Sequence, residues 1–252
     1  MNSMKKGLPS VFTSLGLISG CISIVAALSY GELLLAGYFI LIAALFDFLD
    51  GLVARSLNSI TEFGKQLDSL ADVVSFGVAP SMILYRLLLL SYVRSSPGAD
   101  FDVMNPGPGE GVVLYAAFLV AVFSALRLAK FNLDTGQVKS FRGLPTPANA
   151  IFIAALGFVA ENSRDFPFAG LVFNRYFLLA IVILSCFLLV SNIRMFSLKF
   201  SSFDPAKNWM RYLFLILSVL LIILFGLPGL APVIILYILL SVISRYLKAE
   251  PE

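Results

Sequence analysis

The sequence predicts an all-α fold, a polytopic membrane bundle of about eight transmembrane helices with both termini in the cytoplasm. Three observations support this fold class. The 252-residue chain is 59% hydrophobic and only 13% charged, and its mean hydropathy of +0.93 lies far outside the range of soluble domains. Long apolar runs fill most of the chain, and Lys and Arg are distributed unevenly between the two ends of these runs.

The apolar runs have about the length that a helix needs to cross a bilayer core of about 30 Å. The first run lacks a small-residue cleavage site, so we expect it to remain as a helix rather than be removed as a signal peptide. The fifth run is the shortest. In chain order the runs cover residues 9–28, 33–53, 67–92, 112–131, 147–160, 171–190, 209–225 and 230–246.

Most Lys and Arg residues fall at one set of alternate ends of the runs, and the positive-inside bias assigns these ends to the cytoplasm. They include Lys5, Arg55, Lys130, Arg194 and Arg245. The opposite ends are mainly acidic. We therefore expect a site at the Arg55 end to face the cytoplasm of a bacterial or archaeal cell. The net charge of +3 follows from this bias and indicates no nucleic-acid partner.

The chain contains neither an internal repeat nor a domain break, which predicts one integral membrane domain over residues 1–252. Both cysteines, Cys21 and Cys186, lie inside apolar runs, which argues against a disulfide framework or a zinc site. The chain has no histidine, which excludes His-based catalysis and His metal ligation. Carboxylates remain as the good ligands for a hard cation.

Four aspartates interrupt the apolar sequence within "FDFLDGLVARSLNSITEFGKQLDSLAD", residues 46–72. An Asp in the middle of a membrane helix costs about 2.5–3.5 kcal/mol, so four of them in one short stretch indicate a function. Residues three or four apart share a helix face, so we expect two stripes on adjacent helices that point the carboxylates at each other. The stripes are Asp47, Asp50, Gly51 and Ala54, and Gly64, Asp68 and Asp72.

The start of the second of these helices is predicted by Ser59 and Glu62, which have the spacing of a capping box. This pattern starts the helix near Ile60. It places the two following aspartates in the first turns of that helix.

The aspartate cluster has the chemistry of a metal-assisted phosphate site. Four like charges repel unless cations neutralise them, and Arg55 and Lys65 offset only part of this charge. Carboxylate oxygens suit Mg²⁺ or Mn²⁺, with Ca²⁺ as a possible occupant. The interleaved small residues leave room for a bulky ligand. Two alternatives are interfacial charges that stabilise helix ends and an ion-coupled transport site, which favours carboxylates nearer mid-bilayer and broken helices.

The motif D-x-x-D-G-x-x-A-R-x8-G-x3-D-x3-D resembles the signature of the CDP-alcohol phosphotransferases. "RLAKFNLDTG" (127–136), "FRGLPTPANA" (141–150) and the opening "LPSVFTSLGLISG" are similar to the membrane-type phosphatidylserine synthases, the CDP-diacylglycerol–serine O-phosphatidyltransferases. The chain departs from the family in its first span, where Ser10 and Gly16 stand at positions that are often Asn. The resemblance implies a family core over about residues 8–190, with additional C-terminal helices over about 209–246.

The resemblance implies metal-dependent transfer of a phosphatidyl group from CDP-diacylglycerol to L-serine, with release of CMP, by a homodimer. It implies that Asp72 is the general base. The implied metal ligands are Asp47, Asp50 and Asp68, with Asp72 as a further ligand, for Mg²⁺ or Mn²⁺. The implied CDP-binding residues are Asp47, Asp50, Gly51, Ala54, Arg55, Gly64 and Asp68.

Serine needs a cation for its carboxylate and an acceptor for its ammonium group. The candidates for binding serine or a lipid phosphate are Arg127, Lys130, Asn132, Arg142, Thr146 and Asn149. The alternative for the cationic residues is snorkelling at helix ends. Two other functions stay open: a family member that uses glycerol phosphate, inositol phosphate or choline, and a non-catalytic metal- or lipid-binding membrane protein.

Overall fold

The structure, a computed structural model, describes residues 2–57, 59, 61–95, 106–133, 143–162, 166, 169–193, 195 and 208–246. Over these residues the chain is built from helices and contains no strand. The predicted all-α membrane bundle is confirmed. Of the candidate site residues, Arg142 lies outside the described residues.

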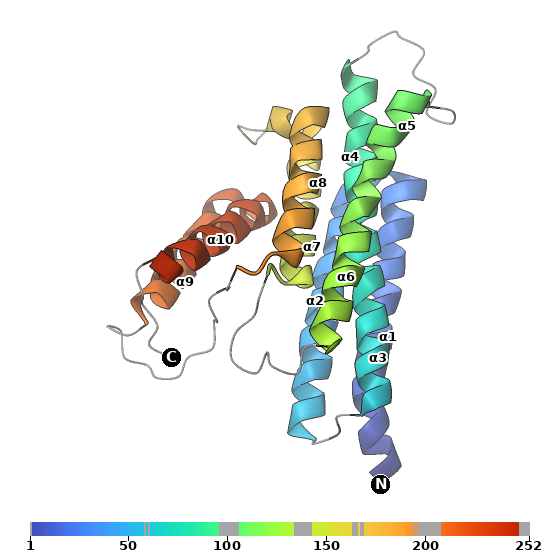
Figure 1. Cartoon of the computed structure of the whole chain (residues 1–252), viewed down its shortest axis with the longest axis vertical. Coiled ribbons are helices and arrows are strands. Elements are labelled where there is room, and N and C mark those ends of the chain that lie inside the picture. The colour runs from blue at the N-terminus through green and yellow to red at the C-terminus, as the bar shows by residue number, and fades with distance from the viewer. Residues whose placement is uncertain are drawn as a thin grey trace.

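Eight helical stretches coincide with the eight apolar runs (Figure 1). Three of them contain a π-helical or 3-10 segment between or after α-helices. In order they are α1 (Asn2–Val25) with the π-helical Ala26–Tyr30; α2 (Leu33–Ser56); α3 (Glu62–Asp72), the π-helical Val73–Val78 and α4 (Ala79–Ser95); α5 (Pro108–Tyr115), Ala116–Phe118 and α6 (Leu119–Leu133); α7 (Thr146–Glu161); α8 (Arg175–Val190); α9 (Trp209–Phe225); and α10 (Leu230–Tyr246), preceded by the 3-10 turn Leu227–Gly229.

Five of the described stretches are long and apolar enough to cross a membrane. Helices α7, α8 and α9 are apolar but have only 16, 16 and 17 residues. At 1.5 Å per residue, 16 residues span about 24 Å, so these three lie at the short end of what a bilayer requires. The protein is an integral membrane protein.

The long helix Glu62–Ser95 is the centre of the bundle. In its most apolar 18-residue segment 61% of the residues are buried, against 33–39% in the corresponding segments of the other four long stretches. Leu84, Leu87 and Leu88 on α4 are completely buried. Helix α1 packs along α2, α7 packs against α2 and α4, and α6 packs against the π-helical segment and α8. The α9–α10 hairpin lies to one side, where α10 contacts α7 (Figure 1).

Helix α1 approaches the π-helical segment closely because small residues lie between them. A Cβ atom added to Gly20 would lie 2.8 Å from Ser75 Cα. The Ser75 hydroxyl donates a hydrogen bond to the Gly16 carbonyl oxygen at 3.1 Å. This contact holds α1 against the turn that directly follows Asp72.

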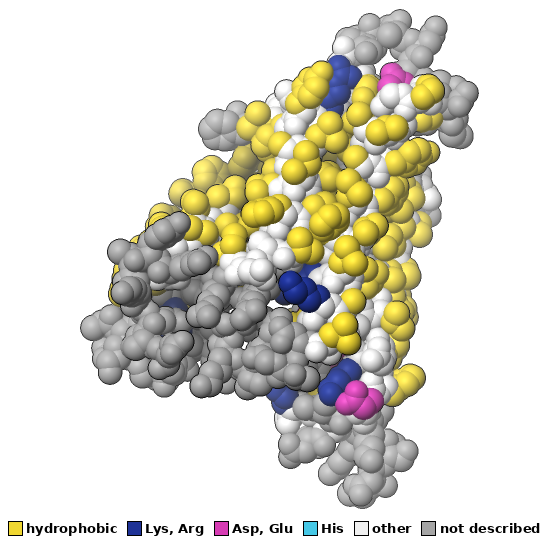
Figure 2. All heavy atoms as spheres, in the orientation of Figure 1, with side chains coloured by type: hydrophobic (Ala, Val, Ile, Leu, Met, Phe, Trp, Pro, Cys, Tyr) yellow, Lys and Arg dark blue, Asp and Glu magenta, His cyan; other side chains and the backbone are white. Residues whose placement is uncertain are grey.

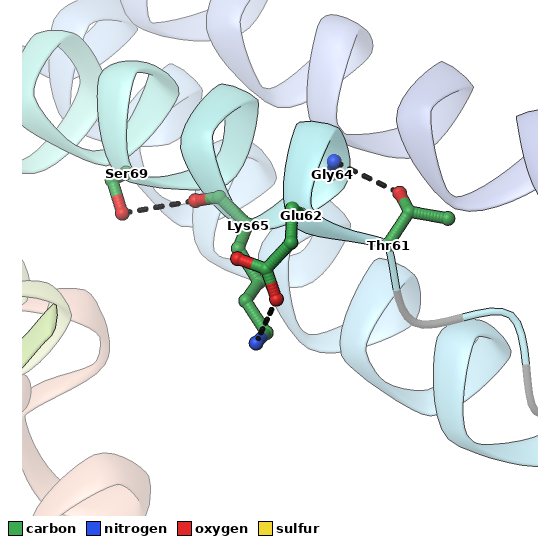
Figure 3. A network of polar contacts seen from close by, with 5 residues as sticks. All are labelled: Thr61, Glu62, Gly64, Lys65 and Ser69. Carbon is green, nitrogen blue, oxygen red and sulfur yellow. Dashed lines mark hydrogen bonds and ion pairs between the residues drawn. The ribbon is translucent and has the colours of Figure 1, made fainter. Parts of the chain in front are cut away.

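The predicted capping box at Ser59 and Glu62 was wrong. The cap of α3 is Thr61, whose hydroxyl oxygen accepts a hydrogen bond from Gly64 N at 3.0 Å. Glu62 is the first helical residue, one position after the cap rather than three, and its carboxylate pairs with Lys65 Nζ at 2.7 Å (Figure 3). The Ser59 side chain is buried instead.

Replacing Gly20 by Ala is expected to destabilise the bundle, because the new methyl group forces α1 away from backbone atoms of the π-helical segment. Overpacking costs about 1–3 kcal/mol, or roughly 2–12 °C in melting temperature for a chain of this size. A thermal scan in detergent measures the change. The control is Gly109→Ala, where an added Cβ meets nothing within 4 Å. Equal melting temperatures for the two variants would contradict the close approach.

Candidate active site

Three aspartates from two helices meet about two turns from the α2–α3 connection. This connection lies at the lower end of the bundle in Figure 1. Asp47 and Asp50 on α2 and Asp68 on α3 each offer one carboxylate oxygen, and these oxygens lie within 4.8 Å of one another. Asp50 is buried, and the other two are partly buried. The helical spacing of the aspartates and the short α2–α3 connection produce this arrangement.

Asp72 lies one helical turn beyond Asp68 and outside this group of three oxygens. Asp72 and the three other aspartates nevertheless line one small cavity, which has an empty volume of about 190 Å³. The cavity is lined by Thr13, Gly16, Ala43, Asp47, Asp50, Asp68, Ala71, Asp72, Ser75 and Phe76. Asp72 therefore faces the same cavity as Asp68 from the next turn of α3.

Thr13 on α1 holds one member of the cluster in place, and the sequence analysis missed it. Its hydroxyl donates a hydrogen bond to Asp50 Oδ2 at 2.7 Å, and the side chain is only 5% exposed. The signal for Thr13 was its spacing. Thr13, Gly16 and Gly20 share one face of α1, and that face lies against the aspartate helices.

A second cavity, with an empty volume of about 480 Å³, opens beside the aspartates. Its lining includes five of the seven predicted CDP-binding residues: Asp50, Gly51, Ala54, Gly64 and Asp68. Helix α1 and the α2–α3 connection supply Pro9, Ser10, Thr13, Ser59 and Thr61, and Lys65 completes the wall.

The remaining two CDP candidates lie elsewhere. Asp47 lines the smaller cavity. Arg55 is exposed, and its Nε donates to the Gly51 carbonyl oxygen at 2.8 Å. The Gly51 position itself stays open, because a Cβ there would approach only Arg55 Nη2, at 3.8 Å.

The carboxylates have no basic side chain as a partner within the described part of the chain. The ion pair found there joins Lys65 to Glu62, and Arg55 bonds to the backbone. Three carboxylate oxygens this close together match the donor set that Mg²⁺ and Mn²⁺ prefer. The residues present therefore fit a divalent metal.

Three candidates for acceptor binding are buried and carry an unpartnered polar atom. Arg127 is 9% exposed, and Thr146 and Asn149 are each 1% exposed. Arg127 Nε, Thr146 Oγ1 and Asn149 Nδ2 have no hydrogen-bond partner among the described residues. Leaving such an atom unsatisfied costs about 1–3 kcal/mol, so these atoms suit the polar groups of a ligand.

Arg127 on α6 has ionisable neighbours on two other helices. Its guanidinium lies within electrostatic reach of the Asp72 carboxylate and of the Tyr237 hydroxyl on α10. Tyr237 and Ala148 both pack against the apolar cluster of Leu144, Leu188 and Met195. Leu144 and Ala148 are close in the sequence to Thr146 and Asn149. The sequence analysis missed Tyr237, since nothing local to α10 indicates contact with α6.

Two further acceptor candidates are placed differently. Lys130 is exposed at the end of α6. The Asn132 side-chain amide donates to Ser69 Oγ at 2.8 Å, and Ser69 Oγ donates to the Lys65 carbonyl oxygen at 3.0 Å. Asn132 therefore ties the end of α6 to α3.

Residues 6–191 match the family described as CDP-alcohol phosphatidyltransferase. The chain belongs to this family. It is 34% identical over 222 residues to a CDP-diacylglycerol–serine O-phosphatidyltransferase of Helicobacter pylori strain 26695, which covers 87% of this chain and 82% of the relative. It is 38% identical over 164 residues to the archaetidylserine synthase of Methanothermobacter thermautotrophicus, covering 63% of this chain and 62% of the relative.

A third relative is the CDP-diacylglycerol–serine O-phosphatidyltransferase of Bacillus subtilis, 32% identical over 151 residues, or 60% of this chain and 75% of the relative. The matched family segment ends at residue 191, so α9 and α10 lie beyond it.

Replacing Thr13 by Val is expected to weaken divalent-metal binding, because Asp50 loses the hydrogen bond that orients it. Removing a partner of a metal ligand typically costs about 10–100-fold in affinity. Electron paramagnetic resonance of free Mn²⁺ measures binding without requiring turnover. The control is Ser14→Ala, which removes an exposed hydroxyl that bonds to its own helix. An unchanged Mn²⁺ affinity in Thr13→Val would assign Thr13 to packing alone.

Proposed function

We propose that the protein transfers the phosphatidyl group of CDP-diacylglycerol to the hydroxyl of L-serine, giving phosphatidylserine and CMP. The observation that carries this function is the cluster of Asp47, Asp50 and Asp68 beside Asp72, next to a cavity walled by Gly51 and other small residues. The names of the relatives from Helicobacter pylori and Bacillus subtilis support serine as the acceptor.

In this proposal Asp47, Asp50 and Asp68 would hold Mg²⁺ or Mn²⁺. The metal would supply Lewis-acid neutralisation of charge on the diphosphate and on the leaving CMP. Thr13 keeps Asp50 oriented. The larger cavity takes the cytidine nucleotide, and its small residues allow the nucleotide to approach the α2 and α3 backbones.

Asp72 accepts the proton of the serine hydroxyl. The serine oxygen forms a bond to the phosphatidyl phosphorus, and the bond from that phosphorus to the CMP oxygen breaks. Arg127 and Asn149 Nδ2 donate to the serine carboxylate, and Thr146 Oγ1 accepts from the ammonium group. Burial of these groups strengthens each contact relative to the same contact in water.

The proposed arrangement has α1–α8 carrying the site, α9–α10 as an addition, and the site facing the cytoplasm, because Arg55, Lys65 and Lys130 lie at that end. Both termini then lie in the cytoplasm. We also propose a homodimer, on family resemblance, which the mass of the detergent-solubilised protein tests.

The function is tested by CMP release from purified protein given CDP-diacylglycerol and Mg²⁺ or Mn²⁺. The acceptors compared are L-serine, glycerol 3-phosphate, inositol phosphate and choline. We expect release with serine alone. Release with another alcohol would overturn serine as the acceptor, and no release under any condition would favour a metal- or lipid-binding protein.

Asp72→Asn is expected to lower the rate of CMP release by about 10²–10⁴-fold, the usual contribution of a general base. Mn²⁺ binding should persist, because the three-oxygen cluster remains. The control is Glu32→Gln, which changes an exposed carboxylate at the N-terminal cap of α2, the end of that helix remote from Asp47 and Asp50. Activity near that of the unmodified protein would exclude Asp72 as the base.

Arg127→Gln is expected to raise the KM for serine by about 10–100-fold, as the loss of a charge-assisted hydrogen bond predicts, and to leave the KM for CDP-diacylglycerol nearly unchanged. Initial rates at varied concentrations of each substrate measure both constants. Arg211→Gln on α9 is the matched control. A rise confined to the KM for CDP-diacylglycerol would place Arg127 on the nucleotide side.

A further inference from the structure

A cavity outside the proposed active site lies where α4 ends and α8 begins. It has an empty volume of about 670 Å³ and is lined by Arg94, Ser95, Gly170, Phe173, Asn174, Arg175 and Tyr176. Figure 2 shows basic and acidic side chains beside apolar surface at this upper end of the molecule. None of these residues takes part in the proposed reaction.

The depth of the cavity in the membrane follows from the central helix. Asp72 and Arg94 lie on the same continuous helix, Glu62–Ser95. Their separation of 22 positions corresponds to about 33 Å at 1.5 Å per residue, close to the thickness of a bilayer core. The cavity therefore lies at the membrane surface opposite the aspartate cluster.

Two arginines from different helices converge on this cavity, and each stacks on an aromatic ring. Arg94 Cζ lies 4.3 Å from the Phe173 ring centroid, and Arg175 Cζ lies 4.8 Å from that of Tyr92. Stacking on a ring positions the guanidinium plane and leaves the N–H groups at its edge able to bind an anion in a bidentate manner. This geometry suits a phosphate group.

The charges of the residues that line the cavity also favour an anion. Arg175 is the first residue of α8, where the helix dipole is positive and disfavours a cation. The Asn174 side-chain oxygen accepts from Tyr176 N and Phe177 N at 2.9 and 3.2 Å. The described lining of the cavity contains no carboxylate. A bound anion would offset both the arginine pair and the helix end.

An exposed apolar stripe runs from the cavity along α8. Tyr176, Ile183 and Phe187 are 73%, 68% and 60% exposed, and their spacing places them on one helix face. A phospholipid whose phosphate lies between the arginines can place its acyl chains along this stripe. A free phosphate ion gains nothing from it.

We propose that this cavity binds the phosphate of an anionic phospholipid in the leaflet opposite the aspartate cluster. Arg94 and Arg175 contact the headgroup phosphate, and the exposed face of α8 contacts the acyl chains. The excess negative charge of the headgroup distinguishes this ligand from a zwitterionic lipid.

Native mass spectrometry of the full chain in detergent tests the proposal, with phosphatidylglycerol and phosphatidylcholine as probes. The variant is Arg94→Gln/Arg175→Gln, and the control is Arg211→Gln, which removes a guanidinium that does not line the cavity. We expect one phosphatidylglycerol per chain whose Kd rises about tenfold or more in the double variant and is unchanged in the control. A photoreactive phosphatidylglycerol should label α8 in the unmodified protein.

Three results would overturn the proposal. They are equal phosphatidylglycerol binding by the double variant, equal binding of phosphatidylcholine, and displacement of the lipid by millimolar inorganic phosphate, which would identify a free-anion site. CMP release and melting temperature are measured on the double variant. If both values match those of the unmodified protein, the double variant is folded, and its weaker lipid binding comes from the loss of the two arginines.

Discussion

Repulsion among the carboxylates of Asp47, Asp50 and Asp68, which α2 and α3 hold close together, is the interaction on which the rest of this site depends. Oxygens of Asp47, Asp50 and Asp68 lie within 4.8 Å of one another, and two unit charges this close repel by roughly 3.5 kcal/mol or more at an effective dielectric constant of about 20. Among the residues that the structure describes, no basic side chain pairs with Asp47, Asp50 or Asp68, because Lys65 pairs with Glu62 and Arg55 bonds to the Gly51 carbonyl oxygen. The charge is thereby kept for a divalent metal and a diphosphate.

This constraint explains features that are unusual for membrane helices. The α1 face toward the aspartates carries Thr13, Gly16 and Gly20 rather than large apolar residues, so a helix can come close enough to donate a hydrogen bond to Asp50. The Ser75 bond to the α1 backbone fixes the same approach one turn further along. The result is a cluster held by its surroundings before any ligand arrives, which lowers the cost of binding.

The sequence was sufficient to predict the parts of the site that depend on local spacing. Asp47 with Asp50, and Asp68 with Asp72, share faces because their separation of three or four residues determines this in any α-helix. The spacing of Thr13 with Gly16 and Gly20 marks one face of α1, but which helix that face meets depends on how α1 packs on α2. Tyr237 lies more than a hundred residues from Arg127 along the chain, so no local pattern pairs these two. The error at Ser59 arose because Thr61 offers the same capping chemistry two residues later, and sequence spacing alone does not decide between the two.

The two ends of the central helix present opposite chemistry. The Asp68 end needs positive charge, and the Arg94 end needs negative charge. Asp72 and Arg94 are separated by about 33 Å, several times the Debye length of about 8 Å at physiological ionic strength. Charges that face water at opposite surfaces then have little direct influence on each other. Any coupling between the two ends has to pass through movement of the buried helix Glu62–Ser95, whose tight packing opposes small displacements. A lipid held at the Arg94 end would therefore anchor the helix that carries Asp68 and Asp72, and would do so without altering the charge at the aspartates.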